Sequence, residues 1–176
     1  MVALAAAACD SGTSTDVKAD GPVAFLADAQ FEQAAGFTAD QGKKVVFGAL
    51  AIRNDGNDVA TLDAARLTGP SEKVVDDGAK VVEVRALDVT GGKDLVGAGP
   101  WPFEHYQRDS VPLKGYELGS KQEAELLFVV SIDKTGHWSW PETELTYTSD
   151  GEKYRIRIST GFFICPTSDG DCNKPK

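Results

Sequence analysis

The stretch Glu144-Leu-Thr-Tyr-Thr-Ser-Asp-Gly-Glu-Lys-Tyr-Arg-Ile-Arg-Ile-Ser159 decides the class of fold. In its second half, Tyr154, Ile156 and Ile158 fall on one side of an extended chain, and charged or polar residues alternate with them. The Asp-Gly pair in the middle can adopt the positive φ angles that a tight hairpin turn requires. The stretch therefore predicts two antiparallel strands with one face toward the core.

Further apolar runs on the N-terminal side of this hairpin predict more strands. Lys44–Arg53 is apolar on both faces, as a central strand is. The turn at residues 54–58 and the following run Val59–Leu67 suggest that these two strands form a second hairpin. Val81–Val89 alternates and is expected to be half-exposed, whereas Glu125–Ile132 is the most apolar run and is expected in the core.

About seven or eight short strands with turns between them predict an all-β fold, an immunoglobulin-like antiparallel sandwich of two sheets. We expect this domain to span residues 23–176. Its last strand is expected to run on from Ser159 through residues 161–164 to Cys165. Helix signals are weak: Leu26–Ala35 has helical composition, and an edge strand is the alternative for it.

The two C-terminal cysteines predict a structural disulfide. Between Cys165 and Cys172 lie Pro166 and the dipeptide Asp169-Gly170, all turn formers, so the chain can reverse and bring the sulfurs together. This spacing, without an adjacent His or further Cys, does not make a zinc set, and it is not the redox motif Cys-x-x-Cys. Structural disulfides persist in oxidising compartments, which favours an exported protein.

A third cysteine, Cys9, follows the apolar small-residue run Val2–Ala8. This arrangement resembles the lipobox of bacterial lipoproteins, although Ala6 stands where that motif usually has Leu. The resemblance implies that residues 1–9 are the remnant of a signal segment and that Cys9 carries a lipid. The alternative is a flexible Ala-rich leader with an incidental cysteine. Residues 10–22 carry almost no apolar mass and are predicted to be a flexible tether.

Three further units stand out: Val45–Leu67 with its Asn-x-Gly turn, Pro112–Gly119 before the core strand, and the closing unit Tyr147–Cys165. With these units the chain resembles small lipoproteins of high-GC Gram-positive bacteria. The resemblance implies an exported sandwich, lipid-anchored on the outer side of the cytoplasmic membrane, with a secreted soluble protein as the alternative. It implies no particular activity, because sandwiches of this kind serve many functions.

Charge excludes one class of partner. The chain has 27 acidic and 18 basic residues and a formal net charge of −9. Because no basic cluster is present to neutralise phosphates, nucleic acid is not an expected partner. No apolar run approaches the roughly 20 residues needed to cross a bilayer, so we expect membrane attachment only through lipid on Cys9.

Catalytic patterns are scarce. The chain has two histidines, His105 and His137, and it lacks the Gly-x-Ser-x-Gly and His-Glu-x-x-His motifs. An enzyme is therefore not expected. A metal site would need Glu104 or Asp109 beside the histidines, and we predict neither a metal nor a cofactor.

Two aromatic segments stand out, at residues 101–106 and 137–141, and they hold all three tryptophans. The second and third tryptophans are two residues apart and would face the same side of a strand. They could form a platform on which sugars stack, or they could fill the core of the sandwich. The candidate ligand-binding residues are Trp101, Tyr106, Trp138 and Trp140.

These patterns favour a non-enzymatic protein that acts as a protein-interaction or structural module at the cell envelope. The alternative is a carbohydrate or small-ligand binding protein that uses the aromatic residues. The expected partner is an envelope protein or a glycan. The sequence does not predict an oligomeric state.

Overall fold

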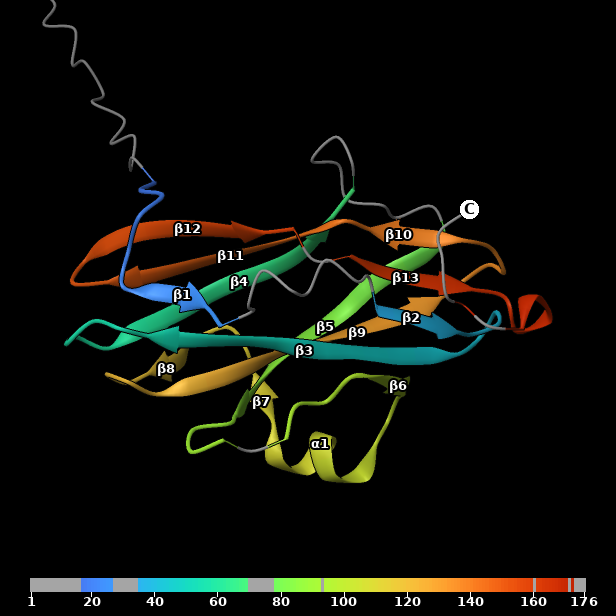
Figure 1. Ribbon diagram of the computed structural model, residues 1–176, viewed down its shortest axis with the longest axis horizontal. Coiled ribbons are helices and arrows are strands. Elements are labelled where there is room, and N and C mark those ends of the chain that lie inside the picture. The colour runs from blue at the N-terminus through green and yellow to red at the C-terminus, as the bar shows by residue number, and fades with distance from the viewer. Residues whose placement is uncertain are drawn as a thin grey trace, which may run out of the picture.

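The computed structural model describes residues 17–26, 35–69, 78–92, 94–159, 161–170 and 172. The described strands form three sheets, which we call the central, hairpin and small sheets (Figure 1). All three contribute to one hydrophobic core, and the predicted all-β sandwich is confirmed. The small sheet is an addition to the two sheets that the sequence predicts.

The central sheet has six strands, in the order β1-β3-β9-β5-β7, with β6 paired to β3 beside this path. Its pairs are antiparallel. In chain order, the strands are β1 (Val23–Phe25), β3 (Lys44–Asn54), β5 (Ala79–Asp88), β6 (Ala98–Pro100), β7 (Val111–Pro112) and β9 (Glu123–Ile132).

The hairpin sheet has the order β12-β11-β4-β8, and the small sheet has the order β10-β13-β2. Only the β13–β2 pair is parallel among the described strand pairs. The strands of the hairpin sheet are β4 (Ala60–Thr68), β8 (Tyr116–Leu118), β11 (Glu142–Ser149) and β12 (Glu152–Ile158). Those of the small sheet are β2 (Ala35–Thr38), β10 (Trp138–Trp140) and β13 (Phe162–Cys165), and the helical turns are α1 (Glu104–Asp109) and η1 (Thr167–Asp169).

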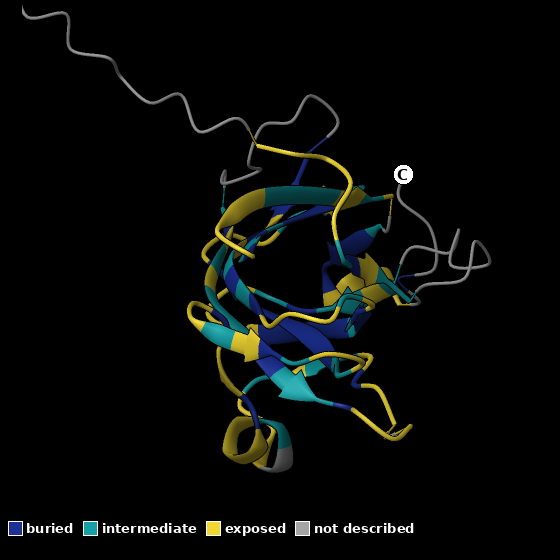
Figure 2. Ribbon diagram, turned by 90° about the vertical axis from the view of Figure 1, so that its left-hand side faces the viewer, coloured by how far each residue is buried: buried dark blue, intermediate teal, exposed yellow. Residues whose placement is uncertain are grey.

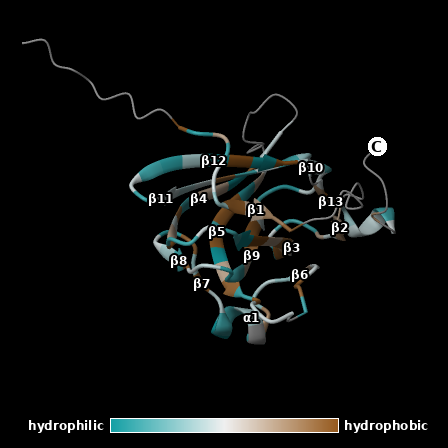
Figure 3. Ribbon diagram, turned by 60° about the vertical axis from the view of Figure 1, so that its left-hand side comes forward, coloured by the Kyte–Doolittle hydropathy of each residue, from teal (hydrophilic) through white to brown (hydrophobic). Residues whose placement is uncertain are grey.

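The core lies between the sheets, where the buried faces meet (Figure 2). Phe47 of the central sheet contacts Trp140 and Phe162 of the small sheet, with ring centroids 6.3 and 4.8 Å apart. Leu145 and Tyr147 of the hairpin sheet are fully buried in the same cluster. Figure 3 shows the hydrophobic residues gathered among β1, β3 and β5, whereas the outlying α1 is hydrophilic. Removing this apolar surface from water is the main favourable term in folding.

The predicted hairpin at residues 144–159 is confirmed. Strands β11 and β12 pair in antiparallel register, with Thr143 opposite Ile158 and Ser149 opposite Glu152. At the turn, Asp150 has φ 49° and Gly151 has φ 71°, the positive angles that the Asp-Gly pair supplies. Strand β9, which covers the predicted core run, is buried over nearly its whole length.

The predicted hairpin between residues 44–53 and 59–67 is wrong. Both segments are strands, but β3 belongs to the central sheet and β4 to the hairpin sheet. Strand β3 pairs with β9 on one edge and with β1 and β6 on the other, so no edge remains for β4. The turn at residues 54–58 instead carries the chain from one sheet to the other.

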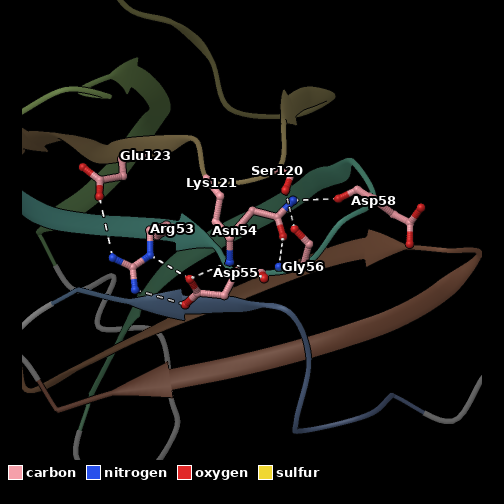
Figure 4. Close-up of polar contacts among 8 residues, drawn as sticks. All are labelled: Arg53, Asn54, Asp55, Gly56, Asp58, Ser120, Lys121 and Glu123. Carbon is pink, nitrogen blue, oxygen red and sulfur yellow. Dashed lines mark hydrogen bonds and ion pairs between the residues drawn. The ribbon is translucent and has the colours of Figure 1, made fainter.

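Asn54 holds this crossing in place, and it is fully buried. Its side-chain amide donates hydrogen bonds to the carbonyl oxygens of Asp58 (2.7 Å) and Leu118 (2.9 Å). Its Oδ1 atom accepts one from the backbone N–H of Gly56 (2.9 Å), as Figure 4 shows. One side chain thus satisfies three backbone groups where the chain leaves the central sheet.

The prediction that the last strand runs on to Cys165 is also wrong. Strand β12 ends at Ile158, and β13 lies in the small sheet between β10 and β2. The change of sheet buries Phe162 against the rings of Phe47 and Phe128. A continued β12 would leave these apolar side chains without this packing.

Residues 17–22 of the predicted tether lie against the domain. The Lys18 N–H donates to the carbonyl of Lys153 (2.9 Å), and the Arg155 N–H donates to the carbonyl of Lys18 (2.8 Å). Gly21 packs against the stacked rings of Tyr147 and Tyr154, where a Cβ atom would come within 2.2 Å of the Tyr147 hydroxyl. These backbone contacts fix a segment whose side chains are too polar to form a core.

Most of Leu26–Ala35 lies outside the described residues, so the choice between helix and edge strand is not decided there. The longest described helix is α1, whose six residues begin in the aromatic segment 101–106, where no helix is predicted. No helix in the described part of the chain has the length and apolar composition needed to span a membrane.

Candidate functional site

The structure separates the four aromatic candidates. Trp138 and Trp140 do share one side of β10, as their spacing predicts, but that side faces the core. Trp140 is 1% exposed and meets Phe47 edge to face, and Trp138 is half-buried against the same cluster. The ligand platform is therefore wrong for Trp140, because pairing of β10 with β13 turns its ring inward.

Trp101 and Tyr106 lie elsewhere, in a small cluster with Val46, Val96 and Leu127 on the other face of the central sheet. Both aromatic side chains are half-buried. Helix α1 presents Tyr106, whose ring stacks on the exposed Phe103 at a centroid distance of 5.1 Å. The four candidates consequently do not form one surface.

Trp101 lines a cavity of about 610 Å³, which we call the Trp101 cavity. It lies among β2, the turn before β3, the end of β6 and the start of η1. Its walls combine apolar side chains with charged ones at the rim. The apolar lining includes Phe37, Val45, Pro100 and Trp101, and the polar lining includes Asp40, Lys43, Lys44 and Thr167.

Backbone pairing positions the cavity walls. The Trp101 N–H donates to the Lys44 carbonyl (2.9 Å), which continues the β3–β6 pairing past Pro100. Opposite it, the Ala39 N–H donates to the carbonyl of Cys165 (3.0 Å). Nothing in the local pattern of residues 39–44 distinguishes them from an ordinary turn, because the cavity exists only once these distant segments meet.

The predicted disulfide between Cys165 and Cys172 is confirmed, with the two Cα atoms 5.8 Å apart. The loop that it closes contributes Thr167 to the cavity wall. Thr167 donates to both carboxylate oxygens of Asp40: its N–H to Oδ1 (3.1 Å) and its hydroxyl to Oδ2. The disulfide loop is thus part of the candidate site as well as a cap on β13.

These two hydrogen bonds from Thr167 lower the pKa of Asp40, so its carboxylate is charged and already engaged. Lys43 and Lys44 are exposed at the rim. Lys43 also interacts electrostatically with Asp40 and contributes to lowering its pKa. The cavity therefore offers an aromatic wall beside two positive charges and the ionised Asp40, a sum of +1, which favours an apolar ring that carries a negative group.

The histidines do not build a metal centre in the described part of the chain. His137 Nε2 lies 3.0 Å from Asp169 Oδ2 at the surface, and the side chain of His105 is outside the described residues. No group of three or more His, Cys, Asp or Glu residues suited to a metal ion is found among the residues described. Cys9, the predicted lipid-attachment residue, also lies outside them.

No protein-family model and no curated protein matches the sequence. Among solved structures, the chain is similar to the VesB protease of Vibrio cholerae, with 11% identity and a TM-score of 0.38 over 82% of this chain and 32% of that one. It is also similar to PapD-like domain 7 of human CEP192, with 11% identity and a TM-score of 0.38 over 94% and 95% of the two chains.

A third similar structure is the secreted serine protease VesC of Vibrio cholerae, with 13% identity and a TM-score of 0.33 over 82% of this chain and 23% of that one. This chain spans about a third of the length of the VesB protease. At this level of similarity, none of the three bears on what the chain binds or does.

Proposed function

We propose that this protein is a non-enzymatic, extracytoplasmic interaction module of the cell envelope that recognises its partner at the Trp101 cavity. The observation that carries the proposal is the meeting of Trp101 with Lys43 and Lys44 at one hollow. Aromatic side chains set in a pocket are the usual anchors of protein interfaces, and charges at the rim select the partner.

The proposed location rests on the cysteines. The bond between Cys165 and Cys172 is of the kind that persists in oxidising compartments, which supports export. The lipobox-like stretch around Cys9 supports a lipid anchor on the outer side of the cytoplasmic membrane.

Mass spectrometry of the natively expressed protein tests the anchor. We expect a mature N-terminus at Cys9 with the added mass of acyl chains. An intact N-terminus before an unmodified Cys9 would exclude the anchor while leaving the Trp101 cavity untouched.

A second candidate function is the binding of a carbohydrate or another small ligand in the same cavity. Its volume of about 610 Å³ lies within the range of small-molecule pockets. Trp101 offers an aromatic face on which a sugar ring can stack.

Replacement of Trp101 by alanine tests both candidates. The full-length protein, immobilised, should retain an envelope protein from extract, and Trp101→Ala should reduce the recovery at least about tenfold, as loss of a buried aromatic anchor does. Phe103→Ala is the matched control, because Phe103 is an exposed aromatic residue nearby that does not line the cavity.

Two outcomes separate the candidates. A saturable change in tryptophan fluorescence with a cell-wall sugar, lost in Trp101→Ala and kept in Phe103→Ala, would favour the small-ligand function. Equal retention of every envelope protein by wild type and both variants, without any fluorescence change, would exclude the cavity as the binding site.

A further inference from the structure

A second feature, independent of the Trp101 cavity, lies on the outward face of the hairpin sheet. The strand register places Glu144 of β11 directly between Arg66 of β4 and Arg157 of β12. Arg155 of β12 is one outward position further along, opposite Thr146. Three arginines thus surround one glutamate on a rigid sheet.

Glu144 is the buried centre of this group, with its side chain 2% exposed. Its Oε1 atom accepts hydrogen bonds from Nε (2.8 Å) and Nη2 of Arg66, and its Oε2 atom accepts one from Nε of Arg157 (2.8 Å). Burial raises the pKa of Glu144, but the hydrogen bonds from Arg66 and Arg157 outweigh this and leave the pKa lowered. Glu144 is therefore an ionised carboxylate.

Glu144 is shared by three guanidinium groups, and its hydrogen bonds go to Arg66 and Arg157. Arg155 gains least from Glu144: its Nε atom lies 3.6 Å from Oε1, which is an ion pair but not a hydrogen bond. That Nε atom is buried and has no hydrogen-bond partner within the described structure, and a buried donor left in this state is costly.

A hollow of about 530 Å³ opens beside Arg155 and Arg157. Its other wall is the segment 17–20, which the backbone bonds of Lys18 hold against β12. Two charged side chains of that wall also line it: Lys18, which pairs with Glu152 at 3.3 Å, and Asp20. The side chains of Arg155 and Arg157 therefore line an open hollow beside the sheet.

We propose that this hollow binds an oxyanion group, a carboxylate or a phosphate, with Arg155 as its principal ligand. The guanidinium presents N–H groups in a planar fork that matches such groups in a bidentate manner. An oxyanion there would pair with the exposed part of the Arg155 guanidinium, which Glu144 does not hydrogen-bond. The protein has a net charge of −9, so it does not attract anions in general. An anion would bind only where the arginines gather.

The test is a titration of the full-length protein with inorganic phosphate and, separately, with acetate, followed by ¹⁵N NMR at constant ionic strength. We expect saturable shifts of the backbone amides of residues 17–20 and 155–157. The anion that saturates at the lower concentration identifies the class of oxyanion.

Two substitutions on the same strand decide whether Arg155 is the ligand. Arg155→Gln should weaken the binding at least about tenfold, as removal of one charge-assisted pair does. Lys153→Gln removes the same charge from the same face of β12 without touching Glu144, and it should leave the affinity within about twofold. Equal weakening by both would show a general charge effect and overturn the proposal, as would the absence of saturable shifts in the wild type.

Arg155→Lys keeps the proposal testable if Arg155→Gln fails to fold. It retains the charge and removes the planar fork, so we expect clearly weaker binding than in wild type. Undiminished binding by Arg155→Lys would contradict a site built on the guanidinium.

Discussion

Replacing Glu125 by alanine is expected to destabilise the protein by about 3 kcal/mol, because two backbone donors, one buried and one partly buried, would lose their acceptor. Glu125 is fully buried in β9. Its carboxylate accepts hydrogen bonds from the backbone N–H of Ala49 and of Val96, the latter at 2.8 Å. Unfolding by urea, followed by circular dichroism, measures the effect.

The surroundings of Glu125 explain why a carboxylate is tolerated in the core. The β3–β9 register shifts between Phe47 and Leu50, and Ala49 there has φ 65°, so its N–H points away from the ladder. A Cβ atom at Gly48 would come within 2.4 Å of Glu125 Oε1. The carboxylate thus lies at the bulge. It accepts the hydrogen bond from the Ala49 N–H that regular pairing with the neighbouring strand would otherwise accept.

Glu125 should also make the free energy of unfolding depend on pH. Burial raises its pKa from the ordinary 4.5, and the hydrogen bonds from Val96 and Ala49 only partly oppose this. Above pH 4.5 the folded protein then binds more protons than the unfolded chain, so this residue makes stability fall as pH rises toward the folded pKa.

Glu125→Gln isolates the effect, because it keeps an acceptor and removes the titration. The difference in unfolding free energy between wild type and Glu125→Gln should shift against the wild type as pH rises above 4.5. Parallel pH profiles for the two proteins would contradict the prediction. Asp40, Asp55 and Asp133 have lowered pKa values, so their contributions are lost only as pH falls below the ordinary 3.8, outside this window.

Asn54→Ala is expected to cost about 2 kcal/mol, because three backbone groups lose a buried hydrogen-bond partner at the crossing between sheets. Asn54→Asp should cost at least as much, since it keeps the acceptor for the Gly56 N–H but sets a buried carboxylate oxygen against the carbonyls of Asp58 and Leu118. The midpoint of urea unfolding at equal slope measures both.

Asp58→Ala is the control for Asn54. The side chain of Asp58 is exposed, and only its carbonyl oxygen takes part in the turn (Figure 4). We expect a change of less than about 0.5 kcal/mol, as for other surface substitutions. An Asn54→Ala variant as stable as Asp58→Ala would show that the turn does not depend on the buried amide.

Strict alternation and the Asp-Gly pair let the sequence predict the hairpin at residues 144–159, and apolar runs let it predict the strands that became β3, β5 and β9. These signals are local, since an inward-facing Ile156 and a positive φ at Gly151 depend on residues close in the chain. The disulfide between Cys165 and Cys172 was predictable for the same reason, because only a short turn separates the two.

Local pattern could not decide which strands pair. Residues 44–67 read as a hairpin, but β3 is paired on both edges by distant strands, and buried Asn54 directs the chain into the other sheet. The aromatic candidates depended on the same choice: pairing of β10 with β13 buries Trp140, whereas Trp101 reaches a cavity at the end of β6.

The sequence by itself determined the class of fold, the longer strands and the disulfide, because alternation, turn residues and short loops act within a few residues. Only the tertiary structure decided the sheet order, the Trp101 cavity and the arginines around Glu144. Each of these joins segments far apart in the chain, such as Arg66 and Glu144, whose contact depends on which strands become neighbours.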